Sequence, residues 1–127
     1  MPTVLVVDDE PDILLLHRLT LESAGHRVVL AADGVTALER MSDQHFDAVV
    51  LDVRMPVLDG WQVLERMATY ESPPPVLVVS AHLGADDVVK AQRLGAADWI
   101  NKPFDQEDFL RRVANLVQMN GQTGGDG

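Results

Sequence analysis

The sequence predicts an α/β fold in which one parallel sheet is covered by helices on both faces. Short runs rich in Val and Leu alternate with longer stretches of helical character, and this alternation is typical of consecutive βα units. Gly, Pro and Asp residues fall at the boundaries between the runs, where turns and helix ends favour them. The chain has 127 residues and is 46% hydrophobic, which suits one core within one domain. We therefore expect five βα units in a doubly wound sheet.

Five short runs are the expected strands. The first, third and fourth are nearly continuous Val and Leu, as is typical of strands buried on both faces. The second and fifth carry more polar residues, so we expect them at the edges of the sheet. In chain order the runs are residues 4–7, 27–31, 48–51, 76–79 and 98–100.

Each expected helix is marked by residues that favour its beginning or its end. Pro11 begins the first helix and Gly25 follows it. The signals for the second to fifth helices are, in chain order, Asp33-Gly34, Asp59-Gly60, Gly84 and Pro103. Residues 1–119 are expected to form the domain. The segment 120–127 has no apolar residue and is predicted to be a flexible tail or a linker stub.

The composition excludes several classes of function. The chain has no cysteine, which rules out disulfides, thiolate zinc sites and cysteine nucleophiles and suits a reducing compartment. A net charge of −10 opposes direct binding to the phosphates of a nucleic acid. The longest apolar runs are too short to span or enter a membrane. We expect a cytoplasmic domain that contacts neither a membrane nor nucleic acid directly.

Polar residues follow four of the expected strands. Asp8, Asp9 and Glu10 follow the first, Asp52 the third, Ser80 the fourth and Lys102 the fifth. Functional groups of open parallel sheets gather at the carboxyl ends of the strands, so these side chains are expected to share one pocket. Two carboxylates about 4 Å apart repel by roughly 1 kcal/mol in water and by about 4 kcal/mol at an effective dielectric constant near 20. The cluster therefore needs a cation, and oxygen ligands indicate Mg²⁺.

This set of groups suits phosphoryl transfer. A carboxylate can attack phosphorus to give an acyl phosphate, while Mg²⁺ and a lysine neutralise the phosphoryl oxygens. Asp52 is the best nucleophile candidate because it stands alone at the end of the central strand. Lys102 is one of only two lysines in the chain, which otherwise uses arginine. Ser80 is placed to donate a hydrogen bond to a phosphoryl oxygen.

Five segments in order resemble the receiver domains of two-component signalling. They are VVDDEP at 6–11, LDVRMPVLDG at 51–60, VSA at 79–81, GAADW at 95–99 and KPF at 102–104. The resemblance extends from residue 3 to about residue 119. It implies a flavodoxin-like (βα)5 fold with strand order 2-1-3-4-5.

The resemblance also implies roles for the metal ligands. Asp52 would be the phosphoacceptor, Asp9 and Asp52 would bind Mg²⁺ directly, and Asp8 would act mostly through water. The backbone carbonyl of Arg54 would supply a further ligand.

Other implied roles concern the phosphoryl group and the switch. Ser80 and Lys102 would contact the phosphoryl oxygens, and Ser80 with Trp99 would form the switch pair. Gly60 and Pro103 would be structural turn residues, the latter after a cis peptide bond. Trp99 is bulkier than the aromatic residue usual there, and Arg54 and His82 occupy positions that tune the phosphoryl lifetime in the family.

The resemblance further implies partners rather than an enzymatic turnover of substrate. The phosphoryl donor would be a histidine kinase or a histidine phosphotransfer protein. The surface of the fourth helix, fifth strand and fifth helix would then act on a downstream effector protein or domain, or on a second copy in a homodimer. The first helix carries more leucine than one buried stripe requires, and we expect the surplus to form a docking surface for the donor. These leucines are Leu14, Leu15, Leu16, Leu19 and Leu21.

Other functions fit the sequence less well. An aspartate-nucleophile phosphatase would carry its nucleophile on the first strand, and a flavin carrier would need a hydroxyl- and glycine-rich loop where this chain has three acids. The four histidines lack metal-ligand spacing and are expected to be structural or exposed. The main alternative is a receiver-like interaction module that works without phosphorylation.

Overall fold

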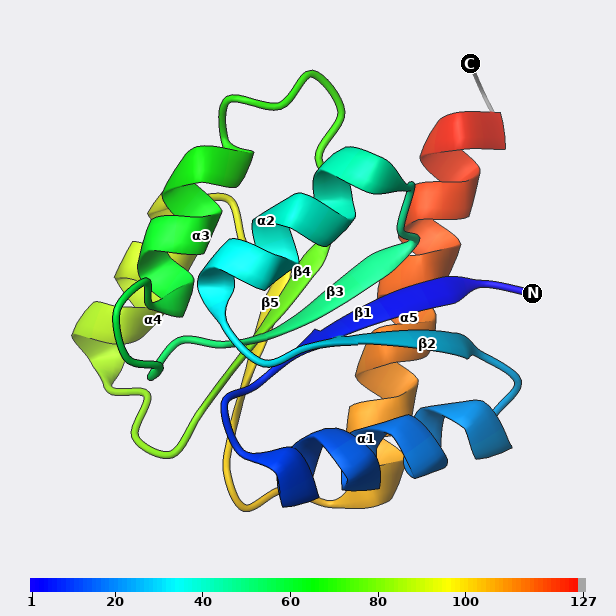
Figure 1. The fold of residues 1–127 in the computed structure, drawn as a ribbon, viewed down its shortest axis with the longest axis horizontal. Helices are drawn as coiled ribbons and strands as arrows, with labels where there is room; N and C mark the ends of the chain where they lie inside the picture. The colour runs from blue at the N-terminus through cyan, green and yellow to red at the C-terminus, as the bar shows by residue number, and fades with distance from the viewer. Residues whose placement is uncertain (126–127) are drawn as a thin grey trace.

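The computed structural model describes residues 1–125, and for residues 120–125 the backbone alone. It is an α/β fold with five strands and five helices in strict alternation (Figure 1). The strands are β1 (Thr3–Val7), β2 (Arg27–Ala31), β3 (Ala48–Asp52), β4 (Val76–Ser80) and β5 (Asp98–Asn101). The helices are α1 (Pro11–Ser23), α2 (Gly34–Asp43), α3 (Gly60–Met67), α4 (Ala85–Arg93) and α5 (Gln106–Gly125). The predicted fold class is confirmed.

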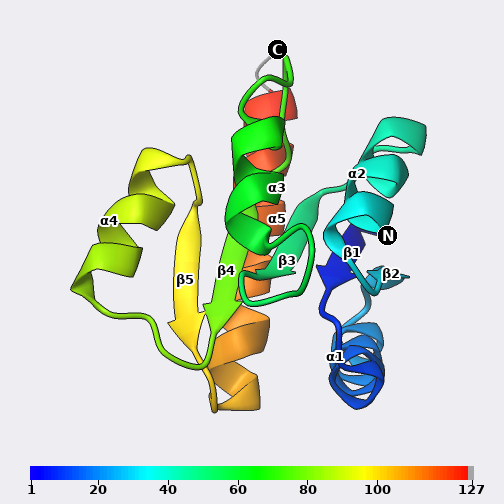
Figure 2. The ribbon, with the colours of Figure 1, turned by 60° about the vertical axis from the view of Figure 1, so that its left-hand side comes forward.

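The strands form one parallel sheet in the order β2-β1-β3-β4-β5. Figure 2 shows β5 at one side of the sheet and β2 at the other, which confirms the prediction that the two more polar strands are edges. β3 and β4 are buried along their whole length. Both end one residue later than the sequence predicts, so that Asp52 and Ser80 are the last residues of their strands.

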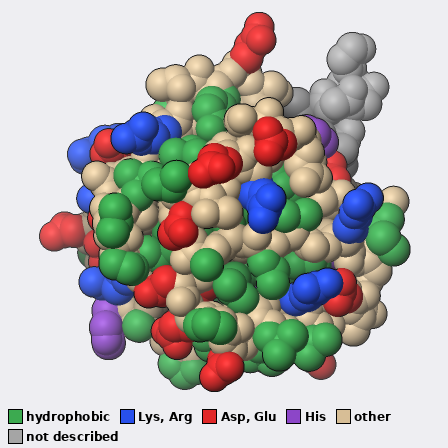
Figure 3. Space-filling model, in the orientation of Figure 1, with side chains coloured by type: hydrophobic (Ala, Val, Ile, Leu, Met, Phe, Trp, Pro, Cys, Tyr) green, Lys and Arg blue, Asp and Glu red, His purple; other side chains and the backbone are tan. Residues whose placement is uncertain are grey.

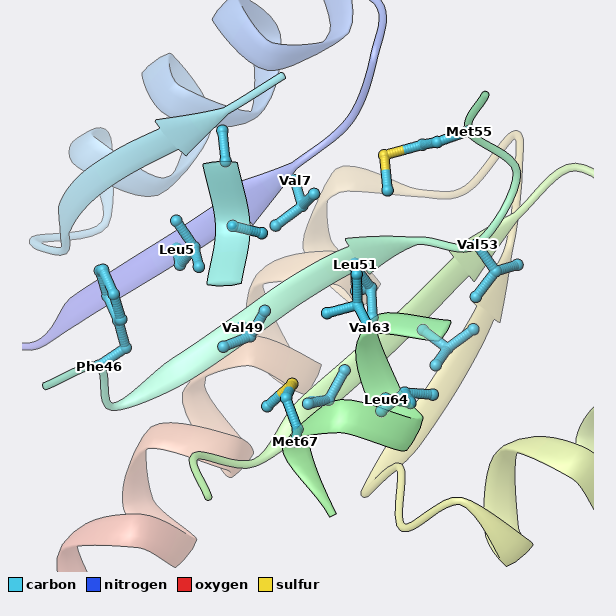
Figure 4. Packing of buried hydrophobic residues seen from close by; sticks show 14 of the residues in the cluster. Leu5, Val7, Phe46, Val49, Leu51, Val53, Met55, Val63, Leu64 and Met67 are labelled. Atoms are coloured by element: carbon cyan, nitrogen blue, oxygen red, sulfur yellow. The ribbon is translucent and has the colours of Figure 1, made fainter. Parts of the chain in front are cut away.

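Two layers of helices cover the sheet, and the core divides between them. Alternate side chains of each strand point to opposite faces, so Leu5 and Val7 pack toward α2, α3 and α4, whereas Val4 and Val6 pack toward α1 and α5. Figure 4 shows the first of these clusters, in which β1 and β3 side chains meet Val63 of α3. Both faces of the central strands are thus buried, which explains their continuous Val and Leu.

Most of the predicted helix signals act at the ends of the helices, but Pro103 lies in the loop before α5, which begins only at Gln106. Pro11 occupies the first turn of α1, and the Asp33 carboxylate accepts a hydrogen bond from the Thr36 amide at the start of α2 (2.7 Å). At α3, the Asp59 carboxylate accepts from the Gln62 amide, and the Gln62 side chain accepts from the Asp59 amide. These bonds satisfy amides that a helix start leaves without partners.

The leucines of α1 divide between the core and the surface. Leu14 and Leu21 are buried, whereas Leu15, Leu16 and Leu19 are 54%, 45% and 57% exposed. Figure 3 shows hydrophobic side chains at the surface over α1, along the lower edge of the molecule. The surplus predicted from the sequence is therefore real, but Leu14 belongs to the core.

The C-terminal helix is longer than the sequence suggests. α5 continues to Gly125, into the segment expected to be a tail. Residues 126 and 127 lie outside the described part. Among the described helices, none is both long and apolar enough to cross a lipid bilayer.

Candidate phosphoacceptor site

The ends of four strands bring the predicted polar residues to one edge of the sheet. Val7, the residue before Asp8, pairs with Leu51, and Asp52 pairs with Val79 of β4. Ser80 pairs with Asn101, the residue before Lys102. Parallel pairing therefore places side chains from distant parts of the sequence next to one another, as the sequence predicts.

Lys102 joins two buried carboxylates at this edge. Its Nζ lies 3.0 Å from Asp8 Oδ2 and 3.5 Å from Asp52 Oδ2. The side chains of Asp8 and Asp52 are only 2% and 7% exposed. Backbone amides hold the remaining oxygens, since Glu10 donates to Asp8 Oδ1 (3.0 Å) and Arg54 donates to Asp52 Oδ1 (2.9 Å). Each carboxylate is thus fixed from two sides.

The charges at this edge are strongly coupled. Burial raises the pKa of Asp52 above its ordinary value, and the charge of Asp8 adds to the rise, although the Arg54 amide and Lys102 oppose it. Burial alone would lower the pKa of Lys102, but its hydrogen bond to Asp8 and the charges of both carboxylates raise it overall. Lys102 therefore stays a cation, and Asp52 carries its charge at a cost that an additional cation would reduce.

The acidic run after β1 has the geometry of a cation site. Asp8, Asp9 and Glu10 each offer a carboxylate oxygen, and these oxygens lie within 4.8 Å of one another. Asp8 is buried, whereas Asp9 and Glu10 are exposed, so two ligands face solvent. An all-oxygen set with open positions fits Mg²⁺, which keeps part of its water shell. Glu10 is a possible ligand that the sequence analysis did not assign.

Ser80 is bonded to a residue that the sequence analysis did not connect with it. The Arg54 guanidinium donates from Nε to Ser80 Oγ (3.0 Å) and from Nη2 to the carbonyl oxygen of His82 (3.2 Å). Ser80 is fully buried and Arg54 is exposed. In addition, Asn101 Oδ1 accepts a hydrogen bond from the Leu83 amide (2.7 Å). No sequence pattern indicates these contacts, because they join loops to strand ends or to other loops that are 18 to 28 residues apart in the sequence.

The remaining predicted residues surround this group. Trp99 is partly buried and packs on the face of the sheet that carries α2, α3 and α4. At Gly60, a Cβ would lie 2.5 Å from Val53 Cα and 2.6 Å from the Asp52 carbonyl oxygen, so a side chain there would displace the end of β3. The Lys102–Pro103 peptide bond is cis, as expected.

The chain belongs to the response regulator receiver domain family, whose model matches residues 4–114. This match, together with the fold and the strand-end cluster, identifies a signalling domain of two-component systems rather than a classical enzyme.

The chain is similar to two transcriptional regulatory proteins of one species. The chain is 39% identical over 122 residues to the transcriptional regulatory protein PrrA of Mycobacterium tuberculosis, covering 96% of this chain and 52% of that protein. It is 38% identical to the transcriptional regulatory protein KdpE of the same species, covering 94% of this chain and 53% of KdpE. The chain thus spans about half the length of these two regulators.

Solved receiver structures share the fold. The chemotaxis protein CheY4 of Vibrio cholerae is 31% identical with a TM-score of 0.84, covering 91% of this chain and 98% of CheY4. The receiver domain of the sensor histidine kinase PA1611 of Pseudomonas aeruginosa, described with a magnesium ion in its active site cleft, is 28% identical with a TM-score of 0.83. That likeness covers 92% of this chain and 98% of the PA1611 domain.

Proposed function

We propose that this chain is a phosphoacceptor switch in which Asp52 takes a phosphoryl group from a histidine kinase or a histidine phosphotransfer protein. The observation that carries this proposal is the contact of Lys102 Nζ with both Asp8 and Asp52 beside a cluster of three acids. Lys102 and Asp8 are 94 residues apart in the sequence, yet both lie beside Asp52. This arrangement suits a phosphoacceptor, whose carboxylate must be charged to attack phosphorus and whose phosphoryl group must then be neutralised by cations.

Each residue at the site would have a separate role in phosphoryl transfer. A carboxylate oxygen of Asp52 forms the bond to phosphorus as the bond between phosphorus and the donor imidazole breaks. Lys102 lies beside Asp52 Oδ2 and neutralises a phosphoryl oxygen, while the Arg54 amide holds Oδ1 in place. Asp8, Asp9, Asp52 and the Arg54 carbonyl would hold Mg²⁺, which neutralises phosphoryl charge when bound.

The switch would act through the two strands beyond β3. Ser80, at the end of β4, would turn its hydroxyl toward the phosphoryl group, and Trp99 of β5 would follow. Arg112 of α5 is paired with Asp98 of β5 (2.7 Å), so these two elements are tied together. Only Ala91 of α4 is buried, so this helix can shift with little loss of core packing. The α4-β5-α5 surface would thereby signal to an effector or to a second copy.

The donor would dock on α1. Leu15, Leu16 and Leu19 expose apolar surface on the helix that begins directly after the acidic run. Substituting Leu15 and Leu19 by Gln should slow phosphotransfer from a protein donor at least severalfold, while phosphorylation by a small acyl phosphate stays unchanged. Equal rates with the protein donor would contradict this docking surface.

The decisive experiment follows tryptophan fluorescence during titration with beryllofluoride and Mg²⁺. Wild type should show a saturable, Mg²⁺-dependent change, which Asp52→Asn abolishes and Asp43→Asn, an exposed aspartate on α2, preserves. Trp99→Phe would identify which of the two tryptophans reports the change. Intact-mass analysis after incubation with a phosphodonor should show one acyl phosphate that Asp52→Asn lacks.

Two outcomes would contradict the proposal. One is an identical response in wild type and Asp52→Asn, and the other is the absence of an acyl phosphate in wild type while Mg²⁺ still binds. Either result would favour an interaction module that works without phosphorylation.

A further inference from the structure

One arginine connects the loop after β3 to the loop after β4. The backbone amide of Arg54 donates to Asp52 Oδ1 (2.9 Å), so the base of this side chain lies beside the proposed acceptor. Its guanidinium donates to Ser80 Oγ (3.0 Å) and to the His82 carbonyl oxygen (3.2 Å). We call this pair of side-chain hydrogen bonds the Arg54 bridge.

The Arg54 bridge is one of three kinds of contact that hold the loop after β4, beside the packing of Leu83 against the core and the backbone hydrogen bonds at Leu83 and Gly84. Residues 81–84 join β4 to α4, and α4 buries only Ala91. Within the loop, the Leu83 amide donates to Asn101 Oδ1 (2.7 Å). Leu83 anchors the far half of the loop to the core, so the position of residues 81 and 82, which are exposed, depends on the polar contacts at its start.

Ser80 cannot turn freely while the Arg54 bridge is made. A serine hydroxyl has one proton and two lone pairs, and Arg54 Nε occupies one lone pair of a hydroxyl that is otherwise fully buried. Moving Ser80 toward a phosphoryl group on Asp52 would break this charge-assisted hydrogen bond. A phosphoryl group would also offer the guanidinium a charged acceptor, which forms a stronger bond than a neutral hydroxyl does.

We propose that Arg54 is a positioning residue that holds Ser80 and residues 81–84 in the unphosphorylated arrangement through the Arg54 bridge. The proposal rests on the proposed function, since it assigns the contact that opposes the switch before phosphorylation. A two-state equilibrium moves only through contacts that differ between its states. The Arg54 bridge is such a contact, and it belongs to the resting state.

The test compares Arg54→Met and Arg54→Lys with Arg27→Met, which removes an exposed arginine on β2. Backbone amide chemical shifts of residues 81–84 and 99 are recorded without phosphodonor and referred to the wild-type resting and beryllofluoride-bound spectra. Arg54→Met should move these shifts toward their values in the beryllofluoride-bound spectrum. The population of that arrangement should rise roughly two- to tenfold, as the loss of one hydrogen bond implies. Arg54→Lys, which can donate one bond, should restore part of the resting population. Arg27→Met should match wild type.

A second comparison isolates the bond to Ser80. In an Ser80→Ala background the bond is already absent, so adding Arg54→Met should produce less than half of the displacement that it produces alone. An equal displacement in both backgrounds would overturn the proposal. So would resting shifts that stay unchanged in Arg54→Met while beryllofluoride binding weakens, because Arg54 would then contact only the phosphoryl group.

The two proposals fail in different ways. If wild type gives no beryllofluoride-bound spectrum, the proposed function is contradicted. The chemical-shift displacement of residues 81–84 in Arg54→Met, measured against wild-type resting shifts and reduced to less than half in the Ser80→Ala background, then still tests whether the Arg54 bridge holds the loop.

Discussion

The carboxylate of Asp52 experiences opposing interactions at short range. Burial and the charge of Asp8 favour its protonated form, whereas Lys102 and the Arg54 amide favour the charged form, and the balance raises its pKa. A charged Asp52 therefore lowers the stability of the metal-free protein, which is the cost of keeping a nucleophile in a buried position.

Replacing Asp52 by Asn should stabilise the metal-free protein at neutral pH. A raised folded-state pKa means that the folded protein binds this proton more tightly than the unfolded chain. The contribution of Asp52 to stability is therefore fully present at low pH and is lost as the pH rises from 3.8 through the folded-state pKa. Urea unfolding in EDTA should give Asp52→Asn a higher free energy of unfolding than wild type at neutral pH. This difference in free energy should shrink as the pH falls. A difference in the free energy of unfolding that did not change with pH would contradict the raised pKa of Asp52 as its cause.

Val57 combines backbone strain with complete exposure. Its φ is +67° and its exposed fraction is 98%, in the loop between Asp52 and α3. A β-branched residue in the left-handed region is costly because its Cβ meets the backbone, and no burial of Val57 offsets that cost.

Val57→Gly should therefore stabilise the fold. Relief of the left-handed conformation is worth roughly 1–2 kcal/mol, and the greater freedom of glycine in the unfolded chain offsets about 0.4–1 kcal/mol. We expect a net gain of about 0.5–1 kcal/mol, seen as a higher urea midpoint with an unchanged slope. Val35→Gly, at a half-exposed position on α2, should instead destabilise. An unchanged or lower midpoint in Val57→Gly would contradict the strain argument.

At the scale of elements, α1 meets α5 and the loop before it through a stack of three rings. The His17 ring lies 4.8 Å from Phe109 and 5.7 Å from Phe104, measured between ring centroids. His17 is buried, and neither ring nitrogen has a hydrogen-bond partner in the described part of the chain. Burial lowers its pKa below 6.5, Asp8 opposes this, and Lys102 reinforces it. The packing of α1 against α5 therefore favours the neutral form of the His17 imidazole.

Protonation of His17 in acid should lower the free energy of unfolding. Because the folded-state pKa of His17 is lowered, the unfolded chain binds more protons below pH 6.5, and stability falls as the pH falls through that value. His17→Leu should lose less stability than wild type between about pH 7.5 and about pH 5.5, measured by urea unfolding. An equal loss of stability in wild type and His17→Leu would exclude His17 as a cause, since His26, whose pKa burial also lowers, is present in both proteins.

At the scale of the whole molecule, the acidic excess and the strand-end cluster act together. The net charge is −10, and three acids follow one strand within reach of one cation. Figure 3 shows acidic side chains spread across the face in view. A divalent cation therefore relieves a local repulsion within a molecule that is negative overall.

Removing Mg²⁺ should lower the free energy of unfolding. A cation that binds only the folded state stabilises it by about 2.7 kcal/mol at a concentration 100 times its dissociation constant. Thermal unfolding in Mg²⁺ and in EDTA, at matched ionic strength, should show this difference in wild type and its loss in Asp9→Asn. Asp43→Asn should keep it. Equal stabilisation by NaCl would indicate general screening instead of a site.

The sequence predicted the fold and most of the candidate site well because the signals are local or periodic. Buried parallel strands need continuous apolar runs, and helix ends need caps, so the elements and the edge strands followed from pattern. Asp8, Asp52, Ser80 and Lys102 could be placed together because parallel strands end at the same edge of a sheet. The position of Leu14 in the core and the length of α5 depend on packing and helix extension, and were not foreseen.

By itself, then, the sequence determined the class of fold, the strand-end residues and their chemistry. Tertiary structure decided which of those groups touch: Lys102 with both Asp8 and Asp52, and Arg54 with Ser80. The physical reason is that backbone pattern fixes where a strand ends, whereas a side-chain hydrogen bond depends on rotamers and on loops that approach one another only in the folded chain.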